Sequence, residues 1–138
     1  MKIRKATLND VEDLEQINKI AKEETGWWIP QNFKFYEKFL KNKNNEIQLV
    51  RHNNEIVGFL SIEYNPKRKS VWVNDIYVNS RYRKNGIAKK LITKVLDKWK
   101  NKSNSVVLLT ANRNLPIFKK MGFKKTMNFM EFERKNIK

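Results

Sequence analysis

Cysteine is absent from this chain of 138 residues, and histidine occurs once, at position 52. The missing thiols exclude disulfides, a thiolate nucleophile and a cysteine-based metal site. His52 lies in the turn-like stretch RHNNE, so we expect a solvated side chain rather than a catalytic base. No apolar run reaches the roughly 18 residues of a membrane span, and the N-terminal stretch MKIRKATLND lacks an apolar signal region. We therefore expect a soluble, cytoplasmic protein with no membrane partner.

Acidic residues are scarce in the second half of the chain. Residues 1–64 carry ten Lys+Arg and ten Asp+Glu, whereas residues 65–138 carry twenty and four, so the whole net charge of +16 lies in the second half. A basic half raises the local concentration of anionic partners. A solvated lysine-rich surface explains most of these residues equally well, so the charge permits nucleic acid as a partner without favouring it.

The chain length predicts one domain, residues 1–138, with a core of its own. Apolar spacing and turn residues predict a strand at 2–6, helices at 9–24 and 30–40, two strands within 46–64 joined at Asn53-Asn54, a strand at 70–78, a helix at 86–100, a strand at 105–111, a helix at 115–121 and a strand at 122–134. Asn9 and Glu12 have the spacing of a helix-capping pair. The strand at 70–78 is apolar on both faces, which predicts a central position in the sheet. The order predicts an α/β fold of α+β type, with a mixed, mostly antiparallel sheet and helices on both faces.

The segment RYRKNGIAKK, at residues 81–90, joins the predicted central strand to the longest predicted helix. A helix N-terminus presents free N–H groups and a partial positive charge, which together favour an anion such as a phosphate. Gly86 lets a ligand approach the backbone closely, and the small side chain of Ala88 avoids crowding on the first turn. Arg83, Lys84 and Lys89 add positive charge. These residues indicate an anion site, although basic loops are common.

The stretch DIYVNSRYRKNGIAKKLI resembles the acetyl-CoA signature of the GCN5-related N-acetyltransferases, GNAT for short. The signature reads Arg/Gln-x-x-Gly-x-Gly/Ala, and Arg83, Gly86 and Ala88 match it, with Val78 at the end of the strand five residues earlier. NRNLPIFKKMGFKK resembles the second signature, an Asn-headed helix followed by an aromatic residue and Gly-Phe. The resemblance covers nearly the whole chain.

The resemblance implies acetyl-CoA as the acetyl donor, no metal, and an amine as the acceptor. It implies that backbone groups of Ile76, Tyr77 and Val78 hold the pantetheine arm and the acetyl carbonyl. It implies that Asn112 or Asn114 contacts the pantetheine or the acceptor. The backbone amides expected to bind the pyrophosphate are those of Arg83, Lys84, Asn85, Gly86, Ile87 and Ala88.

The catalytic positions depart from the family pattern. The Tyr that often serves as the general acid is replaced by Phe118, which has no proton to give, so Tyr77, Tyr82, water or direct thiolate release remain open. The Glu that some members use as the base is replaced by Asn74, which can orient a water. Asp75 is the adjacent carboxylate, and a β-bulge would turn it toward the site.

Other carboxylates stay open as bases, namely Glu63, Glu23 and Glu24. Six of the fourteen acids lie between Asp10 and Glu24, which suggests a cationic acceptor such as a polyamine-like or peptide amine, or simply a solvated helix face. Trp27 and Trp28 either line the acceptor cleft or cap the core.

We expect an acetyltransferase that acts on a small-molecule or protein amine. The alternatives are a toxin-type acetyltransferase that acts on charged tRNA, and a non-catalytic module that binds acyl-CoA or nucleic acid. Turnover of acetyl-CoA separates the last alternative from the other two. The sequence is compatible with a monomer or a homodimer.

Overall fold

The computed structural model describes residues 2–128 and 130–132, which form two compact units, one up to Leu108 and one from Leu109 onward. The first unit contains β1 (Ile3–Lys5), a 3-10 turn (Leu8–Asp10), α1 (Val11–Thr25), α2 (Phe33–Lys41), β2 (Asn45–His52), β3 (Glu55–Asn65), β4 (Ser70–Val78), a second 3-10 turn (Ser80–Tyr82), α3 (Ile87–Trp99) and β5 (Ser105–Val107). The second unit contains a 3-10 turn (Asn112–Asn114) and α4 (Leu115–Lys120).

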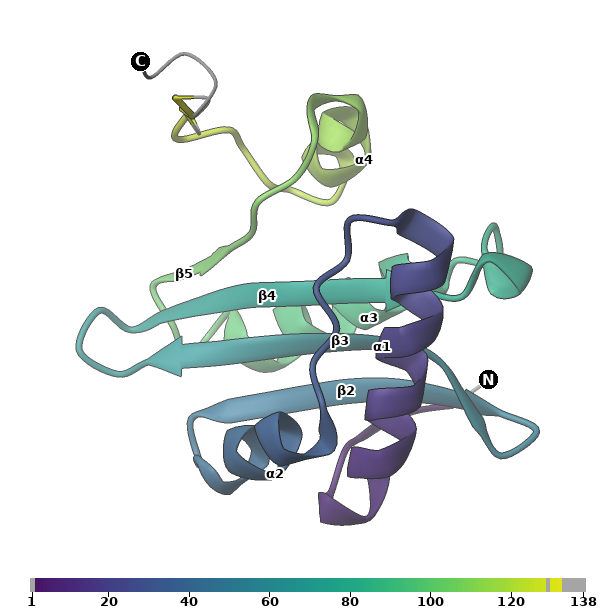
Figure 1. Cartoon of the computed structure of the whole chain (residues 1–138). Helices are drawn as coiled ribbons and strands as arrows, with labels where there is room; N and C mark the ends of the chain where they lie inside the picture. Colours follow the sequence, from purple (N-terminus) through teal and green to yellow (C-terminus); the bar gives the residue numbers. More distant parts are fainter. Residues whose placement is uncertain (1, 129, 133–138) are drawn as a thin grey trace. The chain divides into compact units, whose positions relative to one another are not determined.

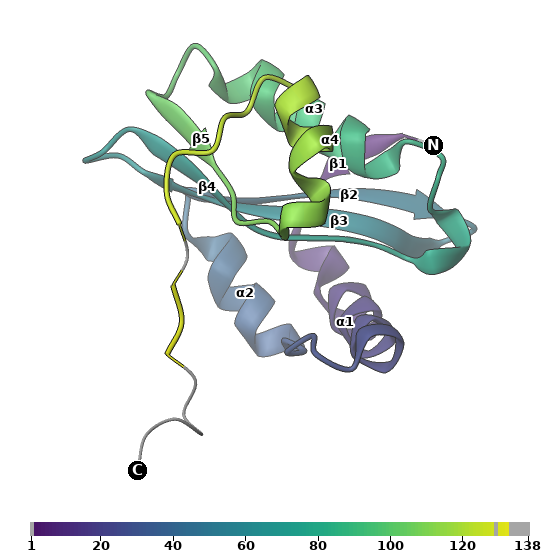
Figure 2. The same ribbon diagram turned by 90° about the horizontal axis from the view of Figure 1, so that it is seen from above.

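The first unit is a five-stranded mixed sheet covered on both faces by helices. The strand order is β1-β2-β3-β4-β5, in which the first four strands are antiparallel to their neighbours and β5 runs parallel to β4. Figure 2 shows α1 and α2 on one face of the sheet and α3 on the other. The predicted fold class and the internal position of β4, between β3 and β5, are confirmed (Figure 1).

The main core lies between the sheet and the pair α1 and α2. Leu14 and Ile17 of α1 pack with Tyr36 of α2 and with Leu49 and Phe59 of the sheet, and all five are buried. On the other face, Ile87, Leu91, Ile92 and Val95 form the buried stripe of α3, as the helical spacing of apolar residues predicts.

Helix α1 begins differently from the predicted Asn9–Glu12 capping pair. Thr7 Oγ1 accepts from the amide of Asn9 at 3.3 Å, and the Thr7 amide donates to Asp10 Oδ2 at 2.8 Å. The prediction was wrong because Thr7-x-x-Asp10 carries the same spacing two residues earlier and opens a 3-10 turn before the helix. The helix ends before Gly26, close to the predicted end at residue 24, and the Gly26 amide donates to Lys22 O at 2.8 Å.

Two predicted strands are overturned or shortened. The strand expected at 105–111 pairs with β4 only over Ser105–Val107 and is at most half-buried. The strand expected at 122–134 is absent from residues 122–128 and 130–132, while positions 129, 133 and 134 lie outside the described residues. The described part of the second unit contains no strand that could pair with this stretch. A strand without a neighbour leaves its backbone N–H and C=O groups without hydrogen-bond partners. The composition of residues 122–134 favours a strand, but it does not provide a neighbouring strand for pairing.

Candidate functional site

The loop from β4 to α3 has an unusual backbone. After the turn Ser80–Tyr82, Lys84 adopts φ +68° and Gly86 adopts φ +74°, so two residues within three are left-handed. Left-handed geometry is ordinary for glycine and uncommon for lysine. The loop is exposed from Arg83 to Gly86, and α3 begins at Ile87.

The amide groups of this loop are left without acceptors. The first helical hydrogen bond of α3 runs from Lys90 N to Gly86 O at 3.0 Å, and Gly86 receives no side-chain cap. Among the described residues, no acceptor is recorded for the amides of residues 84–89. Unpaired N–H groups at the start of a thirteen-residue helix, together with its dipole, make a site for an anion.

Gly86 leaves space above these amides. A Cβ built at this position meets no atom within 4 Å, so the volume over the backbone is open. A phosphate could therefore reach the amides directly. A larger residue would fill that volume with its side chain.

The outer edge of β4 offers a second set of free backbone groups. β5 pairs with β4 only at Ser70–Trp72. Toward the other end of the strand, Asn79 N donates to Val57 O at 2.8 Å, and Tyr77 lies opposite Phe59. Because antiparallel pairs alternate, this bond assigns the backbone groups of Tyr77 to the ladder with β3.

The same alternation turns the N–H and C=O of Ile76 and Val78 toward the open edge. Of the three residues predicted to bind the pantetheine arm, only these two therefore have backbone groups free of β3. The side chain of Arg83 agrees with this assignment, since its Nε donates to Val78 O at 3.0 Å.

Arg83 lies at the junction of the loop and the strand. Its Nη2 also donates to Glu24 Oε1 at 2.6 Å, and its amide is 3.4 Å from Ser80 O. The amides without acceptors therefore begin at residue 84. Burial raises the pKa of Glu24, but the hydrogen bond from Ser80 and the Arg83 charge leave it below its ordinary value. A carboxylate so held is a weak base.

A β-bulge interrupts β4 beyond its last contact with β5. Ser61 lies opposite Asp75 and Ile62 lies opposite Val73, so Asn74 is the extra residue. A bulge bends the strand and re-aims nearby side chains. The pairing with β5 ends at Trp72, two residues before this bulge.

The bulge gathers polar groups on the face of the sheet covered by α1 and α2. Asn74 Nδ2 donates to Glu63 Oε1 at 2.7 Å, and Ser61 Oγ lies 3.5 Å from Asp75 Oδ2. Asp75 is half-buried and close enough to the buried Tyr36 to affect its pKa. Burial raises the pKa of Asp75 despite the contact with Ser61. An open groove beside the bulge is lined by Glu63, Tyr64, Asn65, Pro66, Lys67, Trp72 and Asn74.

The aromatic candidates divide between core and surface. Trp28 is buried and packs on Tyr77 with ring centroids 5.4 Å apart, whereas Trp27 is 72% exposed. The hydroxyl of Tyr77 is buried without a hydrogen-bond partner among the described groups. Burial, followed by the nearby Glu24, raises the pKa of Tyr77 to about 12. His52 is the last residue of β2, and its ring contacts the edge of Tyr82.

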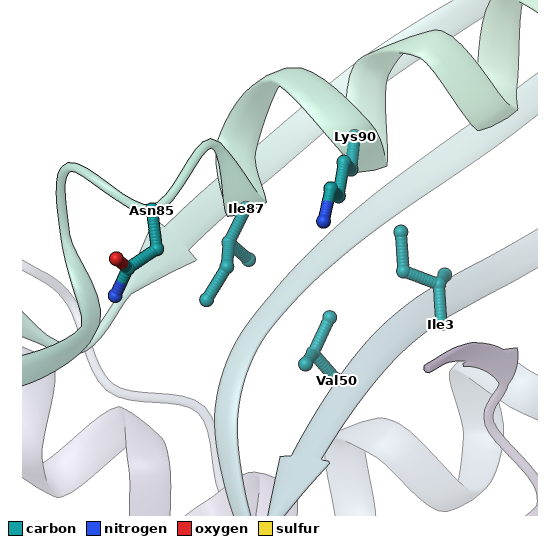
Figure 3. Close-up of a pocket in the computed structure, with 5 residues that line it drawn as sticks. All are labelled: Ile3, Val50, Asn85, Ile87 and Lys90. Carbon is teal, nitrogen blue, oxygen red and sulfur yellow. The ribbon is translucent and has the colours of Figure 1, made fainter. Parts of the chain in front are cut away.

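A separate hollow of about 140 Å³ lies beside the start of α3. Figure 3 shows Asn85, Ile87 and Lys90 facing Ile3 of β1 and Val50 of β2 across it. The strand order places β3 between these strands and β4, so this hollow is distinct from the free edge of β4. The Asn85 side chain also donates to Tyr82 O at 3.3 Å.

The second unit holds the remaining predicted residues. Asn112 and Asn114 form the ends of the 3-10 turn that leads into α4, and their binding role stays a prediction. Phe118 packs edge-on against Phe123 with centroids 5.8 Å apart.

Sequence reasoning missed one contact, the pairing of Glu24 with the loop. The two partners are 59 positions apart, and no local pattern connects them. In the part of the chain that the structure describes, no cluster of three or more His, Cys, Asp or Glu could hold a metal. None of the described helices has the length and apolar character needed to cross a membrane.

Comparisons with known proteins agree with this geometry. Residues 11–123 match the model of the acetyltransferase (GNAT) family. The chain is similar in structure to a Trypanosoma brucei acetyltransferase, with 21% identity, a TM-score of 0.78, and 96% and 98% of the two chains covered.

Two further solved structures have the same fold. A predicted acetyltransferase with acetyl-CoA from Clostridium acetobutylicum shows 22% identity, a TM-score of 0.73, and coverage of 96% and 95%. A ribosomal-protein-alanine N-acetyltransferase from Brucella melitensis shows 20% identity, a TM-score of 0.70, and coverage of 96% and 99%. The family match over most of the chain, on a fold shared with these acetyltransferases, shows that the chain belongs to the GNAT acetyltransferase family.

Proposed function

We propose that this protein is an N-acetyltransferase that moves the acetyl group of acetyl-CoA to a primary amine of a small molecule or a protein. The observation that carries the proposal is the run of amides at residues 84–89 without an acceptor, in front of an uncapped α3. Uncapped N–H groups at a helix start call for a partner, and a pyrophosphate supplies acceptor oxygens and negative charge together.

The free edge of β4 supports a position for the pantetheine arm of acetyl-CoA. The pantetheine arm is a chain with two amide groups, and it would pair with Ile76 and Val78 as an added strand would. An N–H at this edge would also stabilise the oxyanion of the tetrahedral intermediate. The thioester carbon would then lie near the bulge at Asn74.

The bulge also supports a position for the acceptor. The amine nitrogen attacks the thioester carbon while both substrates are bound, and the CoA thiolate leaves. Asp75, half-buried and on the same face as Ser61, takes a proton from the acceptor's ammonium before the neutral amine attacks, or from the amine nitrogen as the new C–N bond forms, and Asn74 orients a water. Phe118 has no acidic proton, so the thiolate leaves unprotonated or takes its proton from Tyr77, Tyr82 or water.

Thermal unfolding with and without acetyl-CoA tests the donor site. A ligand at about 100 times its Kd adds roughly 2.7 kcal/mol to the free energy of unfolding, provided that it binds the folded state alone. We expect such a shift for the wild type, and also for CoA without the acetyl group, because the pyrophosphate is common to both.

A pair of glycine variants makes this test specific to the loop. Gly86→Asn keeps a residue that tolerates the left-handed backbone and adds a side chain over the amides; we expect it to fold and to lose the shift. Gly26→Asn is the matched control, since Gly26 also has φ +74° and no atom within 4 Å of an added Cβ. An unchanged affinity in Gly86→Asn would contradict the site.

A further inference from the structure

Glu24 connects the last turn of α1 to the loop that precedes α3. Its Oε1 accepts from Arg83 Nη2 at 2.6 Å, and its Oε2 accepts from the amide of Ser80 at 3.3 Å. The two oxygens therefore hold both ends of the short 3-10 turn at Ser80–Tyr82. The side chain of Glu24 is 24% exposed, so the contacts are partly shielded from solvent.

Arg83 continues this connection to the strand. Its Nε donates to Val78 O at 3.0 Å, and its guanidinium carbon lies 5.8 Å from the centre of the Tyr77 ring. The guanidinium therefore points back along the end of β4, and its charge is balanced by Glu24. In this arrangement the side chain of Arg83 holds the loop in place, and the amides of residues 84–89 remain free to bind the ligand.

We propose that Glu24 is a positioning residue for acetyl-CoA, which acts through Arg83 and Ser80 by holding the turn that aims the amides of residues 84–89. The proposal rests on the proposed function, because it assumes that these amides bind the pyrophosphate. It also gives Glu24 a role other than that of the general base. A row of amides binds an anion well only when its geometry is set beforehand, and ordering a loose loop would reduce the affinity.

Glu24→Gln tests the inference, because glutamine has one acceptor oxygen and no charge, and cannot serve Arg83 and Ser80 together. We expect the Kd and the KM for acetyl-CoA to rise about fivefold, the upper range for a partly exposed ion pair. The kcat at saturating acetyl-CoA should stay within about twofold of the wild type, since no reacting atom is touched. Glu12→Gln is the matched control, since Glu12 lies on the same helix, is exposed and makes no ion pair with the described residues, and we expect it to behave as the wild type.

A double-mutant cycle separates positioning from a general loss of stability. The combined effect of Arg83→Gln and Glu24→Gln on the Kd should be smaller than the sum of the two single effects, because the carboxylate acts in part through the guanidinium. Additive effects of the two changes would overturn the inference.

The two proposals fail in different ways. Absence of acetyl-CoA binding to the wild type would remove the proposed function itself. Binding by the wild type with an equal Kd for Glu24→Gln would remove only the role of Glu24. A fall in kcat at unchanged KM would also overturn the inference, because it would assign Glu24 to the chemical step.

Discussion

Asp75 is set apart from the other carboxylate near the bulge by its burial. Glu63 is exposed and accepts from Asn74, whereas Asp75 is half-buried and has Ser61 as its nearest polar neighbour. Burial without a charged partner raises the pKa of Asp75. A carboxylate with a raised pKa is a stronger base.

Asp75→Asn should lower kcat at saturating acetyl-CoA by about 100-fold, within the usual range for a general base. The wild-type rate should fall as the pH drops through the raised pKa of Asp75, and the variant should lose this dependence. Steady-state rates over a pH series measure both effects. Asp97→Asn, at an exposed carboxylate of α3, is the control and should keep the wild-type profile. A wild-type kcat in Asp75→Asn would contradict the assignment.

Single residues were predictable when their role depended on neighbours in sequence. Gly86 and Asn53-Asn54 carry the left-handed backbone that such residues favour. Asn18 is a residue whose role could not be predicted from its neighbours in sequence. Its buried amide donates to Leu14 O and Tyr36 Oη and accepts from Trp28 Nε1 and Gln31 N, all at 2.7–3.0 Å. Nothing in the helical pattern of α1 marks it, because three of these partners lie beyond that helix.

At the scale of elements, an ion network joins the start of α1 to the sheet. Asp10 pairs with Arg4 of β1 at 2.7 Å and with Arg51 of β2 at 2.8 Å, and its side chain is 3% exposed. Hydrogen bonds from Arg4, opposed in part by burial and aided by Arg51 and Thr7, hold the pKa of Asp10 well below its ordinary value. The carboxylate therefore stabilises the fold when it is ionised.

Asp10→Asn should reduce the free energy of unfolding at neutral pH by about 2 kcal/mol, as expected for charge-assisted hydrogen bonds with partly exposed partners. Because the pKa is lower in the folded state, the contribution of Asp10 is complete above the unfolded value of about 3.9 and is lost as the pH falls toward the folded value. Urea unfolding between about pH 2 and pH 7 measures both effects, and the variant should lose this part of the acid sensitivity.

Asp13→Asn provides the comparison within the same network. Asp13 also pairs with Arg51, at 2.7 Å, but its side chain is 51% exposed. Asp13→Asn should lower the free energy of unfolding by less than about 1 kcal/mol, as is usual for surface ion pairs. Equal losses for the two variants would show that burial of Asp10 contributes nothing.

Elements were predictable where the signal was local. The spacing of apolar residues located the four helices, and the turn residues separated β2 from β3. The failures concern pairing. The stretch 105–111 has the composition of a buried strand, yet the strand ends at Val107, where its pairing with β4 ends. Strand composition describes one side of a ladder, and the partner is set by the tertiary structure.

At the scale of the whole molecule, charge is divided unevenly along the chain. The net charge of +16 lies entirely in residues 65–138, which include the loop at 83–86. Acetyl-CoA is an anion, so this charge should raise both its local concentration and its affinity.

The Kd for acetyl-CoA should therefore rise when NaCl is increased from about 0.05 M to about 0.5 M, because salt screens exposed charges. Lys89→Ala, at the first turn of α3, should reduce this dependence. Lys43→Ala, which lies in the neutral half of the chain, should leave it unchanged. Titration calorimetry at several salt concentrations measures the slopes, and a salt-independent Kd would contradict a role for the basic half.

The fold class was predictable as a whole because the order of strands and helices, together with two motifs, restricts the topology strongly. The left-handed turn before α3 was predictable because its motif is continuous in sequence, and its binding of the donor stays a prediction. The bulge that brings Ser61, Asp75 and Glu63 together was expected only from the family resemblance, because no turn residue marks its position.

The open loop also carries a chemical liability. Asn85 precedes Gly86, the site is exposed, and no acceptor is recorded for the Gly86 amide. That nitrogen can attack the Asn85 side-chain carbonyl and release ammonia, and hydrolysis of the resulting succinimide yields aspartate or isoaspartate. Either product adds a negative charge beside the bare amides, and isoaspartate also lengthens the backbone. The open loop geometry that would let a phosphate bind therefore also favours deamidation at Asn85.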